Sequence, residues 1–180
     1  KELSRAELAA QLAQCRAVAD APEGVVGFDD RQAMKELVAR YLLALGEAEQ
    51  ALNAAEDVRL SFGFSARSTG GMPNPEVVWR TLLVSAKASL ALGAVPHAVR
   101  FLDQAIEVME SVSPSDGTNS QATADKLDVY RTAVETAYSL YAASPSDENE
   151  AMLWRYLEGM KSRQWREMLA TTGAAFLDRL

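Results

Sequence analysis

The sequence predicts an all-α protein made of antiparallel helix hairpins, with about seven helices. Three observations lead to this fold class. The composition is rich in Ala, Leu, Glu and Gln, which are good helix formers. Apolar residues recur every three to four positions through long stretches, as on one face of a helix. The ten Gly and six Pro gather mostly between these stretches, where they end one helix and open the next.

Two helices are predicted before Gly46. The first ends near Asp20, because a Pro-Glu-Gly segment follows. Asp29 or Asp30 offers a capping carboxylate for the second helix, which ends at Gly46. The apolar period resumes directly after this glycine, so the next helix must run antiparallel and complete a tight hairpin over about 31–61.

A loop is predicted over 62–75, because Gly, Pro, Ser and Thr replace the periodic pattern there. An irregular stretch of this length is either a binding loop, centred on 65–72, or disordered. Asn74 with Pro75 supplies an N-cap and a first-turn proline for a second hairpin over about 75–112, which turns at Gly93.

A third hairpin is predicted over about 122–171. Ser144 to Asp147 caps its second helix, and Thr171-Thr172-Gly173 marks the end of that helix. The apolar segment 174–180 then has nothing left to pack on, so we expect 1–180 to be a single helical domain cut from a longer chain.

The first two hairpins share a pattern of residues at offsets of five, nine and twelve after the turn glycine. The matched pairs are Gly46 with Gly93, Ala51 with Ala98, Ala55 with Leu102, and Val58 with Ala105. The small residue at offset five lets the two helices approach closely. This glycine and alanine pattern resembles the tetratricopeptide repeat, although the glycines lie 47 positions apart and the usual repeat is 34 residues.

The resemblance implies hairpins stacked as a right-handed superhelix whose first helices line a concave groove. Arg40 and Lys87 would both lie in it, six residues before their glycines. Such a groove suits an extended or helical peptide of some acidic character, while the alternative is that these are ordinary solvated side chains. The groove candidates implied are Glu36, Arg40, Leu43, Arg80, Leu83, Lys87 and Leu90.

The segment from Leu157 to Arg163, followed by Met168 and Leu169, is similar to the last repeat of helical arrays that precede a caspase-like CHAT domain. The similarity implies that a catalytic domain would begin beyond Leu180. Lys161, Arg163 and Arg166 form a basic patch that would dock this domain, or that simply complements the negative end of the helix.

We expect a soluble protein that uses no cofactor; its compartment is not determined by the sequence, and the cytoplasm is the favoured expectation. The formal charge of −7 disfavours nucleic acid, and no stretch is long and apolar enough to cross a membrane. Cys15 is the only cysteine and His97 the only histidine, so we expect a buried packing thiol and no metal site. Trp79, Trp154 and Trp165 are expected in the core, or alternatively as partner anchors.

These observations favour a non-enzymatic scaffold or adaptor that binds a peptide or a neighbouring domain. The alternatives are the regulatory arm of a larger caspase-like protease and the sensor domain of a transcriptional regulator. Self-association through exposed terminal helices is a further expectation.

Overall fold

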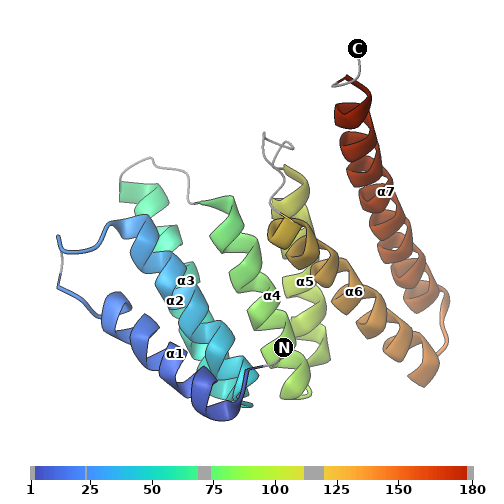
Figure 1. The fold of residues 1–180 in the computed structure, drawn as a ribbon. Helices are drawn as coiled ribbons and strands as arrows, with labels where there is room; N and C mark the ends of the chain where they lie inside the picture. The colour runs from blue at the N-terminus through green and yellow to red at the C-terminus, as the bar shows by residue number, and fades with distance from the viewer. Residues whose placement is uncertain (1–2, 23, 69–73, 112–119, 178–180) are drawn as a thin grey trace. The chain divides into compact units, whose positions relative to one another are not determined.

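The computed structural model describes residues 3–22, 24–68, 74–111 and 120–177, with side chains for 3–22, 24–63, 74–111 and 124–164 (Figure 1). Over these ranges it contains seven helices and no β-strand, which confirms the all-α class. None of the helices in the described ranges has the length and apolar character of a membrane span. The helices are α1 (Arg5–Ala19), α2 (Phe28–Ala44), α3 (Ala48–Ser68), α4 (Pro75–Ala91), α5 (Val95–Ser111), α6 (Ser120–Ala143) and α7 (Asp147–Leu177).

The chain, predicted as one domain, forms two compact units. The first, Lys1–Gly117, contains α1 to α5, and the second, Thr118–Leu180, contains α6 and α7.

Gly46 and Gly93, the turn glycines of the first unit, end α2 and α4 with the same pattern of backbone hydrogen bonds. Gly46 and Gly93 have φ of 86° and 74°, a left-handed conformation that glycine adopts without strain. The N–H of Glu47 donates to the carbonyl of Leu42 at 2.9 Å, and the N–H of Ala94 donates to that of Ser89 at 2.8 Å. Each glycine N–H also donates to the carbonyl three residues before it, at 3.0 Å, which completes a Schellman motif. The predicted turns at Gly46 and Gly93 are therefore confirmed.

Helix α4 lies at the centre of the first unit, where it packs against α2, α3 and α5 (Figure 1). The main core joins α1, α2, α3 and α4, and small residues on α2 and α3 allow these helices to approach closely. Its buried members are Leu12, Cys15, Val38, Ala39, Leu42, Ala51, Ala55, Val84 and Ala88. Ala51 and Ala98, the small residues predicted after the turn glycines, have no exposed surface.

The predicted loop over 62–75 is wrong in its first part, because α3 continues to Ser68. Phe62 is buried with Val58 and Val77 in a second core cluster. Its ring also meets that of Phe28 edge to face, with 6.2 Å between centroids. These contacts outweigh the cost of about 1 kcal/mol for a glycine inside a helix, which here is Gly63. Residues 69–73, which include the second half of the suggested binding loop over 65–72, lie outside the described ranges.

In the first unit, the helix starts of α4 and α1 follow the expected capping chemistry, and that of α2 departs from it. Asn74 accepts a hydrogen bond from the N–H of Glu76 at 2.9 Å, as predicted. Ser4 and Glu7 form a capping box on α1. The prediction that Asp29 or Asp30 caps α2 is wrong: Gly27 is the N-cap, and both carboxylates lie within the first turn, where the helix dipole favours them.

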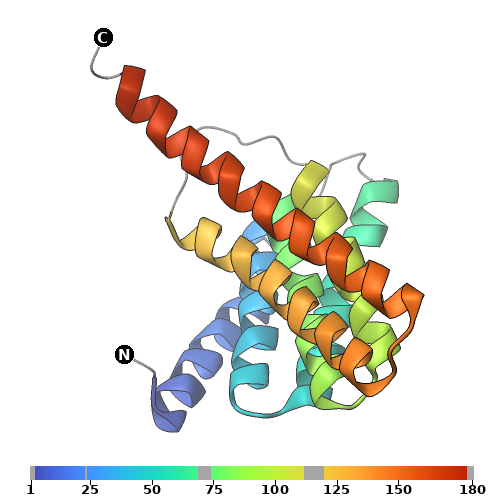
Figure 2. The ribbon, with the colours of Figure 1, turned by 90° about the vertical axis from the view of Figure 1, so that its right-hand side faces the viewer.

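The second unit is an antiparallel hairpin of α6 and α7 (Figure 2). The hydroxyl of Ser146 accepts a hydrogen bond from the N–H of Asn149 at 3.2 Å and caps α7, as predicted. The predicted helix end at 171–173 is wrong, because α7 runs through Gly173 to Leu177. One glycine without a following proline does not stop a helix whose flanking residues are good helix formers.

Candidate functional site

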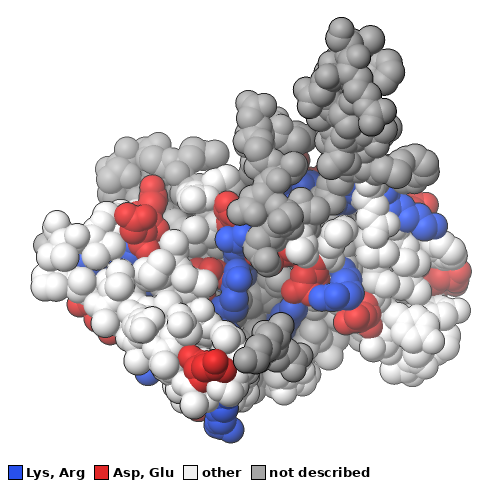
Figure 3. Space-filling model, in the orientation of Figure 1, with Lys and Arg blue, Asp and Glu red and all other residues white. Residues whose placement is uncertain are grey.

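The predicted groove residues come from two neighbouring helices. Helix α2 carries Glu36, Arg40 and Leu43, and α4 carries the others. The two helices are in contact, so residues far apart in the sequence are brought together. Basic side chains appear in a short strip on the face drawn in Figure 3, where α2 and α4 lie beside each other.

Glu36 and Arg40 of α2 form an ion pair at this surface. The side chain of Glu36 is only 4% exposed, whereas that of Arg40 is 39% exposed. One carboxylate oxygen of Glu36 accepts from Nη2 of Arg40 at 2.9 Å and from Nε at 3.1 Å. A buried carboxylate needs such donors, because burial without them costs several kcal/mol. Arg40 is therefore held in one orientation by a group that is itself part of the interior.

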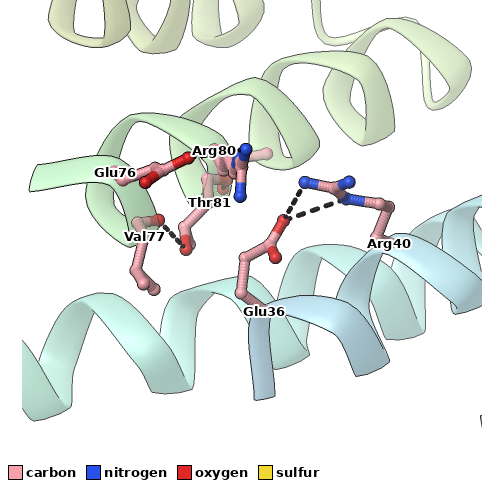
Figure 4. Close-up of polar contacts among 7 residues, drawn as sticks. Glu36, Arg40, Glu76, Val77, Arg80 and Thr81 are labelled. Carbon is pink, nitrogen blue, oxygen red and sulfur yellow. Dashed lines mark hydrogen bonds and ion pairs between the residues drawn. The ribbon is translucent and has the colours of Figure 1, made fainter. Parts of the chain in front are cut away.

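Arg80 of α4 approaches the carboxylate of Glu36 from the other helix (Figure 4). Figure 4 shows its guanidinium and that of Arg40 on either side of Glu36. Nη2 of Arg80 lies 2.7 Å from Oε1 of Glu76, one turn earlier, and its guanidinium carbon lies 5.2 Å from the ring centroid of the buried Trp79. The intrahelical carboxylate and the indole thus restrict the side chain of Arg80.

The remaining groove candidates divide into buried and accessible side chains. Leu83 is buried, as is Glu36, so both support the surface from beneath. Lys87, Leu43 and Leu90 are partly exposed. We use the name α2–α4 surface for the accessible set: Arg40, Leu43, Arg80, Lys87 and Leu90.

Cys15 of α1 lies in the main core, where it packs with residues of α2, α3 and α4. It is buried, which confirms the predicted packing thiol. Burial raises the pKa of the Cys15 thiol above its ordinary value, and the negative charge of Glu36 raises it further. The raised pKa keeps the thiol protonated and poorly nucleophilic at neutral pH.

The predicted docking residues lie on α7 in the second unit. Lys161 is exposed and Arg163 is partly exposed, whereas the side chain of Arg166 lies outside the described set. They lie in the second unit, whereas the α2–α4 surface lies in the first.

The tryptophans differ in their environment. Trp79 is buried, as predicted, but the expectation of a core position is wrong for Trp154, which is 53% exposed. The side chain of Trp165 lies outside the described set. Both Trp79 and Trp154 fit the helical period, so the sequence pattern does not distinguish the buried tryptophan from the exposed one.

The α2–α4 surface offers guanidinium and ammonium donors next to apolar side chains. In the part of the chain that the structure describes, no three His, Cys, Asp or Glu side chains come together as a metal site would require. His97 is exposed in the first turn of α5.

Comparisons of the chain with protein-family models, with curated proteins and with solved structures find no match.

Proposed function

We propose that this chain is a scaffold or adaptor that binds a peptide, or a segment of a neighbouring domain, on the α2–α4 surface. The observation that carries the proposal is the Glu36–Arg40 pair. A buried carboxylate holds a half-exposed guanidinium in place, as expected for a side chain whose orientation matters at the surface.

Orientation of this kind favours recognition of a carboxylate. A guanidinium has five N–H donors in a rigid plane. When its rotamer is already restricted, less conformational entropy is lost on binding, at about 0.5–1.5 kcal/mol for an immobilised side chain. Arg40 therefore suits charge-assisted hydrogen bonds to Asp or Glu of a partner.

The rest of the surface supports a peptide rather than an isolated anion. Leu43 and Leu90 occupy equivalent positions three residues before Gly46 and Gly93, and both are partly exposed. Arg40 and Lys87 are equivalent in the same way. One apolar and one basic position thus repeat from one hairpin to the next, which fits a ligand that alternates acidic and apolar residues along its length.

The test is a titration with a fluorescent peptide library in which Glu and Leu alternate at different spacings. We expect saturable binding by the chain, and weakening of about tenfold or more when Arg40→Gln and Lys87→Gln are combined. Glutamine is preferable to a charge reversal at Arg40, because a new carboxylate beside the buried Glu36 would destabilise the fold.

The matched control is the combination of Arg16→Gln and Arg100→Gln. These exposed cations on α1 and α5 change the net charge by the same amount. Equal weakening in both double variants would mean that binding follows net charge alone, and the α2–α4 surface would not be the site.

A further inference from the structure

Helix α7 carries a stripe of side chains that α6, the other helix of the second unit, leaves exposed. Glu150, Trp154 and Lys161 are exposed and Leu157 is partly exposed. They follow one another at intervals of four, three and four residues, which places them on one face of the helix. We call these four residues the α7 stripe.

The contact between α6 and α7 uses a different face of α7. Tyr156 is buried, and Gly159 lies against the ring of Tyr130 of α6. Helical geometry at about 100° per residue turns Trp154 roughly 160° away from Tyr156. The α7 stripe therefore points away from the hairpin interface.

The indole of Trp154 is held along the helix surface. Its Nε1 donates to Oε1 of Glu150 at 3.3 Å, one turn earlier. An exposed tryptophan in one orientation presents a large apolar area at little further cost in entropy, and tryptophans are common at the centre of protein interfaces.

The α7 stripe is complementary to itself. Its two outer members have opposite charges and its two inner members are apolar. Both pairs are symmetric about the midpoint between Arg155 and Tyr156: Glu150 mirrors Lys161, and Trp154 mirrors Leu157. If two copies of α7 lie antiparallel about a two-fold axis at this midpoint, Glu150 of each copy meets Lys161 of the other, about 8 Å from the axis.

We propose that two copies of this chain associate through the α7 stripe as an antiparallel, two-fold symmetric pair. Trp154 of each copy packs against Leu157 of the other at the centre, and two Glu150–Lys161 pairs flank them. A parallel pair would instead place Glu150 against Glu150 and Lys161 against Lys161, so the charges select the antiparallel arrangement. The α7 stripe belongs to the second unit and the α2–α4 surface to the first, and the inference is independent of the proposed function.

Sedimentation velocity from about 1 μM to about 1 mM protein tests the proposal. We expect a monomer–dimer equilibrium. Glu150→Lys and Lys161→Glu should each weaken self-association by about tenfold or more, because each places like charges together at both ends of the pair. A wild-type chain that stays monomeric over the whole range would overturn the proposal.

Mixing the two charge variants gives the sharpest result. A Glu150→Lys chain and a Lys161→Glu chain complement each other at both ends, so an equimolar mixture should dimerise more strongly than either variant alone. The chain carrying both substitutions should also dimerise. Variants that dimerise as strongly as the wild type would contradict the proposal, and so would failure of the mixture to recover dimers when both chains show wild-type circular dichroism.

Trp154→Ser is an independent test that changes no charge. It should abolish dimers, while Tyr138→Ser, which removes another exposed aromatic side chain from the same unit, should leave them unchanged. Wild-type dimerisation of the Trp154→Ser chain would overturn the proposal even if the charge variants proved too unstable to measure.

Discussion

Gly159 of α7 and the ring of Tyr130 of α6 are in direct contact. A Cβ atom added at Gly159 would lie 2.7 Å from Cε1 of Tyr130, closer than two carbon atoms can approach. Tyr130 is only 3% exposed, so its ring has little room to move. The absence of a side chain at position 159 therefore allows α6 and α7 to approach closely at this point.

Gly159→Ala should destabilise the α6–α7 hairpin by about 1–3 kcal/mol, the usual cost of overpacking. Adding Tyr130→Leu should recover part of the loss, because the smaller side chain makes room for the methyl group. Denaturant unfolding followed by the fluorescence of the tryptophans measures both variants. Gly159→Ala with wild-type stability would show that the helices do not meet at this residue.

The turn glycines should respond differently from a glycine inside a helix. Gly46→Ala and Gly93→Ala place a side chain on a left-handed backbone and should each cost about 1–2 kcal/mol. Gly63→Ala is the matched control: Gly63 lies inside α3 with no neighbouring atom in the way, so it should gain up to about 1 kcal/mol. Thermal unfolding by circular dichroism measures all three. Equal effects at the three positions would contradict the account of the turns.

Arg40→Gln should destabilise the first unit, because the carboxylate of Glu36 stays buried after two of its hydrogen bonds are lost. The expected cost is about 1–2 kcal/mol, reduced from that of a fully buried pair by the exposure of Arg40. The double variant Glu36→Gln with Arg40→Gln should be more stable than Arg40→Gln alone, since no buried charge remains. Urea denaturation gives both values, and a double variant with the larger loss would contradict this explanation.

Cys15 should react slowly in the folded chain. Burial and the charge of Glu36 raise the pKa of its thiol, so less thiolate is present at any alkaline pH. Labelling with a thiol-specific disulfide reagent at about pH 8 should be at least tenfold slower than in urea-unfolded chain. A rate equal to that of the unfolded chain would show that the thiol is accessible.

The same pKa shift has a consequence for stability. Above about pH 8.5 the thiol of the unfolded chain begins to lose its proton while that of the folded chain keeps it. The free energy of unfolding should therefore fall as pH rises from the ordinary thiol pKa toward the raised one, and should not change from this source at lower pH. Cys15→Ala should remove this component from the pH dependence of unfolding.

The turns of the fold could be predicted from local residues alone. Gly46, Gly93 and the Asn74-Pro75 pair act through their own backbone conformations and hydrogen bonds, so the sequence pattern was sufficient there. The continuation of α3 past Phe62 could not be predicted in this way, because it depends on packing against Phe28 and Val77, which are distant in the sequence.

The sequence pattern predicted which helices carry the candidate residues, but not how deeply each side chain is buried. Counting back from the turn glycines placed Arg40 and Lys87 on neighbouring helices, which the structure confirms. Helical period does not say how closely two helices approach, so it did not distinguish the buried Glu36 and Leu83 from their accessible neighbours. The contact of Gly159 with Tyr130 was missed for the same reason, although a glycine inside a strong helix pattern was the available signal.

The most direct test of the α2–α4 surface is a nitrogen-15 chemical-shift titration of the chain with the tightest peptide from the Glu–Leu library. We expect the largest shifts on α2 and α4, around Arg40, Leu43, Lys87 and Leu90, with a side-chain Nε signal of Arg40 that moves on binding. Shifts centred on α1, on α7 or on the exposed face of α5, with α2 and α4 unchanged, would contradict the proposed function.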